Sequence, residues 1–364
     1  MHGGRGVENY SHPDPAVRVR SISMVPPPRS TSSIRYAPRK ATCCALFTAV
    51  ALVARGAAAD PSTTSPEQGY DLGEIPSPRS VGMGGAQTAL GTSTTALYLN
   101  PANLPFARVY HFEGIAAVSP DARRQTYGGA IADSTTSRLA GGVGGAWSQL
   151  DPDGIHRSWT DFRLSLAYPL SDKIGLGATG RYLRASQSVG AGPFGADSVS
   201  GGTRGDPIFN QITFDAGLTV APTDGLRLGV VGKNLTNPGS AFAPTTLAGG
   251  VGYATPQVAI EADALADFTT WQSTRGRFMV GGEVFLADHV PLRAGYRYDD
   301  GQRAHAISGG AGYVDKKWSF ELSVRRDVSA DHPMTLFVAG LRYFMDNGSN
   351  EGGLGNFSQS GGGF

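Results

Sequence analysis

The stretch Asp161-Phe-Arg-Leu-Ser-Leu-Ala-Tyr168 places a large apolar side chain at every second position. The apolar set is Phe162, Leu164, Leu166 and Tyr168, and the positions between them include Asp161, Arg163 and Ser165. Successive side chains of a β-strand point to opposite faces of the sheet. The stretch therefore predicts a strand with one apolar face and one polar face.

The same alternation recurs along the chain, most clearly in 212–219, 258–264 and 292–298. These units are about ten residues long and are separated by turn residues, which suits tilted strands that cross a bilayer. We count fourteen of them. They begin near Arg108, Arg124, Arg138, Trp159, Ile174, Asn210, Leu226, Thr246, Val258, Arg277, Leu292, His305, Trp318 and Leu336.

The connections between these units alternate between short and long. The even-to-odd connections are tight turns, namely 169–172, 222–224, 255–256, Asp288-His289 and Asp315-Lys316. The odd-to-even connections are mostly longer, and the largest covers about 185–206. This asymmetry is typical of the periplasmic and extracellular ends of an outer-membrane barrel. A soluble sandwich or propeller also alternates in polarity, but it has no reason to keep the asymmetry.

The sequence thus predicts an all-β fold, a 14-stranded antiparallel transmembrane β-barrel over 106–345, surrounded by lipid of the cell outer membrane. Aromatic residues near the strand ends favour it, because amphipathic rings suit the headgroup level. They are Tyr168, Tyr182, Tyr253, Phe285, Tyr296, Tyr298, Tyr313, Trp318 and Tyr343. The Gly-rich tail, 346–364, has almost nothing to bury and is predicted to be disordered.

Composition narrows the class of protein. The chain has 364 residues, a formal net charge of +1, 17% charged residues and a mean hydropathy of -0.17. It has no apolar run long enough to span a membrane as a helix. It also has no basic excess that would attract phosphates, so a nucleic-acid partner is not expected.

The N-terminal region predicts export. An apolar run at 41–54 follows Arg39 and Lys40 and precedes small residues up to Ala59, which is typical of a secretory signal cleaved near Ala59. A short buried helix would leave the two basic residues without a role. We therefore assign 1–59 to an extension and a cleaved signal peptide. Both cysteines lie in this region, so the exported chain is expected to lack disulfides and thiolate chemistry.

The segment 60–105 is not strand-like and is the candidate for a plug. Eight strands enclose a lumen that side chains fill and about 16 to 18 leave a water channel, so a barrel of about 14 needs something inside. Close approach to the wall is favoured by Gly84, Gly85 and Ala86, and a turn by Asn100, Pro101 and Ala102. A loose periplasmic tail is the alternative reading.

The run Met83-Gly-Gly-Ala86, followed by Thr88-Ala-Leu90 and Ala96-Leu-Tyr-Leu-Asn-Pro-Ala-Asn-Leu104, resembles the N-terminal signature of FadL-type and PorV-type outer-membrane barrels. That resemblance implies fourteen strands with an N-terminal segment tucked into the lumen. Two further segments, 231–235 and 292–297, resemble segments of the PorV-like branch. The chain is therefore placed closer to that branch.

The polar faces of the predicted strands carry charges of both signs. The expected lumen-lining cations are Arg163, Arg181, Arg227, Lys233, Arg293, Arg297, Arg325 and Arg342. The expected anions are Asp161, Asp215, Glu261, Asp263, Glu283 and Glu321. Unpaired charges in a confined lumen are costly in free energy, so we interpret these residues as oppositely charged pairs along the inner wall. A polar translocation path, or a gate between wall and plug, remains the other interpretation.

No constellation of residues predicts an enzyme. The dipeptides Asp288-His289 and Asp331-His332 fall on connections and lack a partner nucleophile motif, so they are interpreted as turn residues. The other histidines share no metal-ligand spacing. The glycines of 141–145 lie inside a strand pattern with no helix after them, which favours close contact with the plug over a nucleotide loop. We expect no cofactor and no metal.

Two functions follow as hypotheses. The first is passive transport of small or hydrophobic solutes across the outer membrane, with hydrophobic small molecules as partners. The second is a non-enzymatic, PorV-like scaffold whose partners are proteins of a secretion system.

Overall fold

The computed structural model describes residues 74–121, 124–150, 156–188, 207–239, 243–329 and 333–345. The predicted signal peptide, the first part of the predicted plug (60–73), most of the largest connection (189–206), Asp331-His332 and the C-terminal tail lie outside the described residues.

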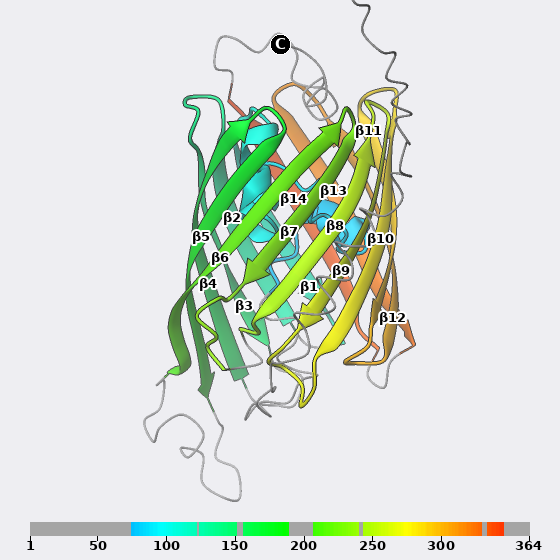
Figure 1. Cartoon of the computed structure of the whole chain (residues 1–364). Coiled ribbons are helices and arrows are strands. Elements are labelled where there is room, and N and C mark those ends of the chain that lie inside the picture. Colours follow the sequence, from blue (N-terminus) through cyan, green and yellow to red (C-terminus); the bar gives the residue numbers. More distant parts are fainter. Residues whose placement is uncertain are drawn as a thin grey trace, which may run out of the picture. The chain divides into compact units, whose positions relative to one another are not determined.

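In the described part of the chain, fourteen antiparallel strands form a closed barrel in which β1 pairs with β14 (Figure 1). The strands are β1 Tyr110–Ser119, β2 Arg124–Asp133, β3 Ala140–Leu150, β4 His156–Ser171, β5 Ile174–Ser188, β6 Pro207–Thr223, β7 Leu226–Lys233, β8 Thr246–Ala254, β9 Val258–Asp267, β10 Arg275–Leu286, β11 Val290–Asp299, β12 Ala304–Val314, β13 Trp318–Ser329 and β14 Thr335–Phe344. The predicted fold class is confirmed. Closure pairs each strand on both sides, which satisfies backbone groups without water.

The strand boundaries follow the alternation closely. β2, β5, β7, β8, β9 and β13 begin at the predicted residues, and the other strands begin within three residues of theirs. One predicted turn is wrong, because β4 continues through Pro169 to Ser171. Its pairing with β5 shifts register between Pro169 and Ser171, since proline offers no N–H to the ladder. The predicted turn at 222–224 also differs in its first two residues, since β6 runs to Thr223.

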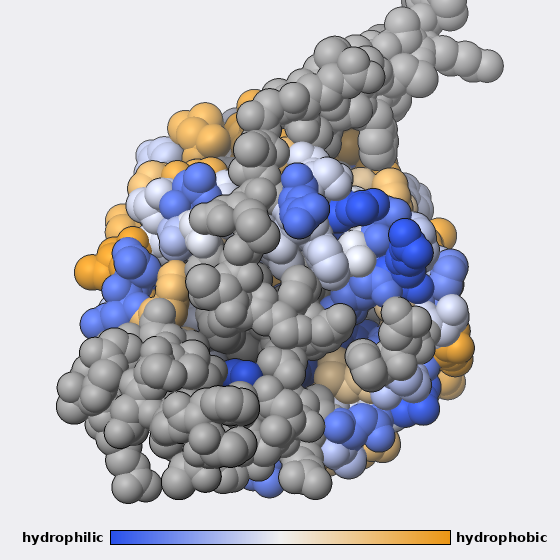
Figure 2. Space-filling model, turned by 90° about the horizontal axis from the view of Figure 1, so that it is seen from below, coloured by the Kyte–Doolittle hydropathy of each residue, from blue (hydrophilic) through white to orange (hydrophobic). Residues whose placement is uncertain are grey.

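The wall has an apolar outside and a polar inside. On β4, Leu164 is 54% exposed whereas Arg163 is 1% exposed. Figure 2 looks onto one open end, and there the apolar side chains gather at the periphery while hydrophilic ones surround the middle. Large apolar side chains exposed all round a closed barrel need a solvent that is itself apolar, which is what a lipid bilayer supplies.

The N-terminal described residues form three short helices inside the ring (Figure 1, cyan). They are α3 Pro78–Gly82, α4 Thr94–Tyr98 and η1 Pro101–Phe106. α3 contacts β11 to β14, α4 contacts β2 to β4, and η1 contacts β3 to β6. We call 74–106 the plug. Among the described residues, no helix is long and apolar enough to cross a membrane.

The polarity of the wall inverts at one end of β4, β5 and β6. We call the end at which odd-numbered strands finish the outer end, and the opposite end the inner end. Near the outer end, the buried, inward-facing residues are the apolar Trp159, Leu183, Ala185 and Phe209, which form a cluster with Ala243. The rings of Trp159 and Phe209 stack with centroids 5.9 Å apart. These long strands therefore enclose a small apolar core beyond the charged part of the lumen.

The ladder between β6 and β7 is incomplete. β7 has eight residues and pairs with β6 only from Ala216 to Thr223. The rest of β6, from Pro207 to Asp215, meets the connection that follows β7. That connection contacts β6 through the Leu235 N–H, which donates to the Phe214 carbonyl at 2.9 Å, and through the hydroxyls of Thr236 and Thr213, 2.9 Å apart. We call this region the β6–β7 gap.

The outward orientation of the apolar residues of β4 predicts that two arginine substitutions on this strand differ in their effect on stability. Leu164→Arg puts a charge on the lipid-facing side near the middle of the strand, and we expect it to destabilise the inserted barrel by about 2–4 kcal/mol. The matched control is Leu170→Arg at the inner end of the same strand, where the cost falls to about 0–1 kcal/mol. Ser165 cannot serve as a control, because it is fully buried and 2.7 Å from the Thr179 hydroxyl. Urea titration of the protein folded into vesicles measures both variants, and equal losses would contradict the assigned facing.

Candidate functional site

The first half of the plug approaches the wall through glycines. Ser77 caps α3 by accepting a hydrogen bond from the Ser80 N–H, and the helix is followed by Gly84 and Gly85, both with positive φ. A Cβ on Gly84 would lie 2.8 Å from the backbone N and O of Tyr296. On the wall, a Cβ on Gly295 would overlap the plug backbone in the same way. Glycine on both sides lets the plug backbone lie directly on β11.

The Asn-Pro-Ala-Asn turn joins the two halves of the plug to β6. The Asn100 side chain accepts from the Ala102 N–H at 3.1 Å and donates to the Thr88 carbonyl at 2.8 Å and to the Thr219 hydroxyl at 3.1 Å. Asn103 donates to the same Thr88 carbonyl at 3.0 Å. A Cβ on Gly217 would collide with the Asn100 side chain. The motif therefore acts as a buried polar crosslink.

Two neighbouring carboxylates of β9 hold the loop between α3 and α4. Asp263 accepts from the N–H groups of Gln87 and Thr88 at 2.8 and 2.9 Å. Glu261 accepts from the N–H groups of Ala89 and Leu90 at 2.5 and 3.0 Å. Hydrogen bonds to a charged acceptor are stronger than neutral ones. Four consecutive plug amides are thus fixed by two side chains of one strand.

A ladder of alternating charges crosses five strands and ends on the plug. Arg342 of β14 contacts Glu113 of β1 at 2.9 Å and Glu321 of β13 at 3.3 Å. Arg293 of β11 contacts Glu321 at 3.2 Å and Glu283 of β10 at 2.5 Å. Arg79 of α3 then contacts Glu283 at 2.8 Å. These side chains are buried, so each charge depends on its neighbours in the ladder.

A second charge cluster lies under the end of α4. Asp161 contacts Arg163 and Arg181, each at 2.7 Å, and Arg181 also reaches Asp215 at 3.5 Å. Arg163 donates to the Tyr98 carbonyl at 2.9 Å, and its guanidinium lies over the Tyr98 ring. Burial raises the pKa of the Tyr98 phenol, so its hydroxyl stays neutral. A cation at a helix C-terminus is favourable, which helps to fix α4.

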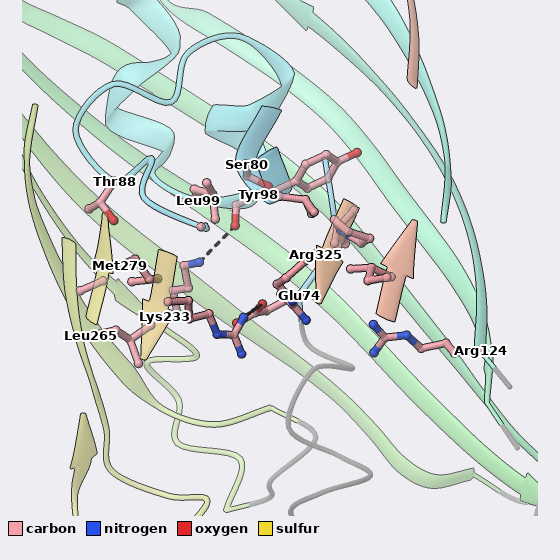
Figure 3. Close-up of a pocket in the computed structure, with 17 residues that line it drawn as sticks. Glu74, Ser80, Thr88, Tyr98, Leu99, Arg124, Lys233, Leu265, Met279 and Arg325 are labelled. Carbon is pink, nitrogen blue, oxygen red and sulfur yellow. Dashed lines mark hydrogen bonds and ion pairs between the residues drawn. The ribbon is translucent and has the colours of Figure 1, made fainter. Parts of the chain in front are cut away.

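An open cavity lies on the outer side of the plug (Figure 3). Lys233, the last residue of β7, lines it and donates to the Tyr98 carbonyl at 3.2 Å. Glu74 also lines it and pairs with Arg277 of β10 and, at 3.3 Å, with Arg297 of β11. The rest of the lining mixes cations and apolar side chains, namely Arg124, Arg325, Ile75, Val81, Ala248, Leu265, Met279 and Leu336. The plug thus closes the inner side of a partly charged, partly apolar chamber.

No family model matches the chain, and no curated protein matches it. Solved structures do. The CymD monoaromatic hydrocarbon channel matches with a TM-score of 0.59 and 16% identity, over 76% of this chain and 98% of that one. The Ralstonia pickettii toluene transporter TbuX matches with a TM-score of 0.57 and 15% identity, over 76% of this chain and 100% of that one. A Pseudomonas aeruginosa FadL homologue matches with a TM-score of 0.50 and 14% identity, over 74% of this chain and 99% of that one.

The chain has the fold of these barrels. The resemblance to the FadL type is therefore confirmed at the level of the fold. These matches give no support to a closer likeness to the PorV-like branch.

The structure brings most of the sequence-predicted site residues into three groups on the inner wall. Asp161, Arg163, Arg181 and Asp215 form the cluster under α4, whereas Glu283, Arg293, Glu321 and Arg342 belong to the ladder. Glu261 and Asp263 bind the plug loop. The Arg227 guanidinium lies 5.0 Å from the centre of the Phe106 ring. Lys233, Arg297 and Arg325 line the cavity.

Sequence reasoning missed Glu74, Arg79, Glu113, Asn103 and Arg124 as members of the site. Glu113 and Arg124 carry the signal of a polar residue at an inward strand position. Arg79 and Glu74 carry no periodic signal, because they lie in irregular or very short elements.

Asp288-His289 lies in the turn between β10 and β11, and the His289 ring stacks on Tyr313. Within the described ranges, no group of three His, Cys, Asp or Glu residues could hold a metal ion.

The close approach at Gly84 gives a prediction with a matched control. Gly84→Ala adds a methyl group at a positive φ and against the Tyr296 backbone, so we expect the plug to lift from β11. Gly239→Ala is the control, because its φ is also positive but nothing lies within 4 Å. Limited proteolysis of the folded barrel should cut the plug faster in Gly84→Ala only. Equal cutting of both variants would mean that backbone conformation alone matters.

The β9 carboxylates give a second prediction. Asp263→Asn replaces one acceptor oxygen by an NH2 group that cannot accept from the plug amides, and a hydrogen bond contributes about 0.5–1.5 kcal/mol. We therefore expect faster hydrogen exchange at the amides of Gln87 and Thr88. Asp121→Asn is the control, because Asp121 pairs with Arg326 on an exposed turn away from the plug. Unchanged exchange in Asp263→Asn would contradict the proposed attachment.

Proposed function

We propose that this protein is an outer-membrane barrel that lets small hydrophobic solutes cross passively. The observation that carries the proposal is the outer chamber, closed on its inner side by a plug that polar contacts hold in place. The solved structures with this fold include a monoaromatic hydrocarbon channel and a toluene transporter. Such a role needs no catalytic group and no energy source.

The β6–β7 gap supports a route through the wall. The gap begins at Lys233, which also lines the chamber. The apolar cluster that includes Trp159, Phe209 and Ala243 lies on the same side of the barrel, since Ala243 belongs to the connection after β7. An apolar solute can leave the chamber there without crossing a continuous ladder, whereas elsewhere it would have to break paired strands. The route would deliver the solute to lipid.

Nothing in the described residues favours the secretion scaffold. A scaffold needs a surface that fits a protein partner, whereas the outside of this barrel is the apolar face that lipid covers. We therefore favour transport, with hydrophobic small molecules and outer-membrane lipid as the partners.

A reversible crosslink across the gap tests the proposal. The hydroxyls of Thr213 and Thr236 are 2.9 Å apart, so the double variant Thr213→Cys, Thr236→Cys places two thiols where a disulfide would fasten the connection onto β6. We expect oxidation to reduce uptake of toluene at least tenfold, and reduction to restore it. The assay measures labelled toluene entering vesicles whose outer leaflet carries lipopolysaccharide.

The control crosslink lies within a complete ladder. The hydroxyls of Thr126 and Ser148 are 2.8 Å apart and face each other across β2 and β3. Oxidation of Thr126→Cys, Ser148→Cys should leave uptake unchanged. Toluene uptake no faster than in protein-free vesicles would overturn the proposed function. Uptake that survives complete oxidation of the Thr213→Cys, Thr236→Cys variant would overturn the wall route.

A further inference from the structure

The connection that follows β7 runs along β6 where the ladder between these two strands is missing. Its first residue, Asn234, donates its backbone N–H to the Asp215 carboxylate at 2.8 Å, and Leu235 donates to the Phe214 carbonyl at 2.9 Å. Asn234 is buried, whereas Leu235 is exposed. The start of the connection is therefore held against the β6–β7 gap, with Asn234 on its buried side.

Asn234 joins three parts of the wall. Its side-chain oxygen accepts from Arg181 of β5 at 2.9 Å, and its side-chain nitrogen donates to the Pro244 carbonyl, near the end of the connection, at 2.7 Å. Its φ of 54° lies in the left-handed region, which asparagine tolerates better than most residues. Asparagine thus suits this position twice, because it bends the chain away from β7 and supplies a donor and an acceptor together.

Arg181 belongs to the buried charge cluster that holds the end of α4. It pairs with Asp161 at 2.7 Å, and Asp161 pairs with Arg163 at 2.7 Å. Arg163 donates to the Tyr98 carbonyl at 2.9 Å. A continuous run of buried polar contacts therefore leads from Asn234 to the plug. Buried polar groups lose free energy when their partners move away, so the two ends of the run affect each other.

Lys233 closes this run into a ring. It directly precedes Asn234, and its ammonium group donates to the Tyr98 carbonyl at 3.2 Å. The end of α4 is thus attached to the start of the connection by two routes, one through side chains of β4 and β5 and the other through Lys233. α4 cannot leave its place without breaking both links or carrying the start of the connection with it.

We propose that Asn234 is the positioning residue of the wall route, because it fastens the connection over the β6–β7 gap to the cluster that holds α4. The inference rests on the proposed function and specifies how the route is controlled. While α4 is in place, the cluster holds the connection against β6. When α4 moves away, the connection loses this attachment. The gap and this half of the plug therefore open together, and each biases the other by the same factor.

The coupling concerns one half of the plug. α4 contacts β2 to β4, beside the cluster, whereas α3 contacts β11 to β14. The two helices end in comparable hydrogen bonds, since the Leu99 N–H donates to the Thr95 carbonyl and the Met83 N–H to the Arg79 carbonyl, both at 3.1 Å. Hydrogen exchange of the Leu99 and Met83 amides therefore compares the two halves of the plug.

The reversible crosslink across the gap supplies the perturbation. In the Thr213→Cys, Thr236→Cys variant, oxidation fixes the connection on β6 and reduction frees it. We expect oxidation to slow hydrogen exchange of the Leu99 amide about fivefold, which is at the low end of couplings between sites, and to leave the Met83 amide unchanged. NMR on the folded protein in detergent micelles measures both amides, and it needs no solute.

Two glycine variants of the crosslinkable protein identify the residue responsible. Asn234→Gly keeps a residue that accepts the positive φ but removes both side-chain hydrogen bonds, so oxidation should no longer slow exchange at Leu99. Asn237→Gly is the matched control. Asn237 lies in the same connection with a φ of 50°, and its side chain accepts from two threonine hydroxyls, at 3.1 and 3.4 Å, rather than from the cluster. In this variant the slowing at Leu99 should persist.

The outcomes separate this inference from the proposed function. Unchanged exchange at Leu99 after complete oxidation, or equal slowing at Leu99 and Met83, would overturn the coupling even if oxidation abolishes toluene uptake. Both results come from the crosslinkable protein itself, so they hold even if Asn234→Gly does not fold.

The glycine variants and the uptake assay decide the remaining points. Slowing that persists in Asn234→Gly would overturn the role of Asn234, and so would its loss in Asn237→Gly. Absence of toluene uptake would overturn the transport function, whereas slowing confined to Leu99 would still support the coupling.

Discussion

A ring of fourteen strands is too wide for its own side chains to fill, and the interior of this protein is arranged around that constraint. Lipid fixes the outward positions as apolar, whereas the inward positions at the level of the plug are mostly polar or small. Buried polar groups need partners, and the plug provides many of them through backbone amides, asparagines and the end of α4. The plug and the charged wall are therefore two halves of one hydrogen-bonded structure.

Most of the barrel could be predicted from the sequence because lipid acts on every second residue of every strand. Alternation placed β2, β5, β7, β8, β9 and β13 at their first residues. The alternation pattern failed where contact with lipid does not determine which residues face outward. Beyond the charged part of the lumen, β4 to β6 turn apolar residues such as Trp159 and Leu183 inward. At Pro169 the strand continues with a shifted register, which a turn-forming residue alone does not reveal.

The contacts of the plug could be predicted only in part. Gly84 and Asn100 were identifiable, since their residue types suit close approach and a turn. Their partners were not, because the Ala89 amide and Glu261 are 172 positions apart and no local pattern links them. The positions of the charged residues along the barrel axis were equally hard to predict from local sequence patterns. Alternation shows which charges face the lumen, but their height along the axis depends on strand tilt and register. The sequence therefore did not show which charged residues meet the plug and which line the cavity beside it.

Lys233 connects the three features on which the proposed function rests. It ends β7 where the β6–β7 gap begins, it lines the outer chamber, and it donates to the Tyr98 carbonyl at the end of α4. Just beyond Lys233, the connection contacts β6 through single hydrogen bonds, such as that from the Leu235 N–H to the Phe214 carbonyl, rather than through a strand ladder. The proposed wall route therefore meets the plug at Lys233.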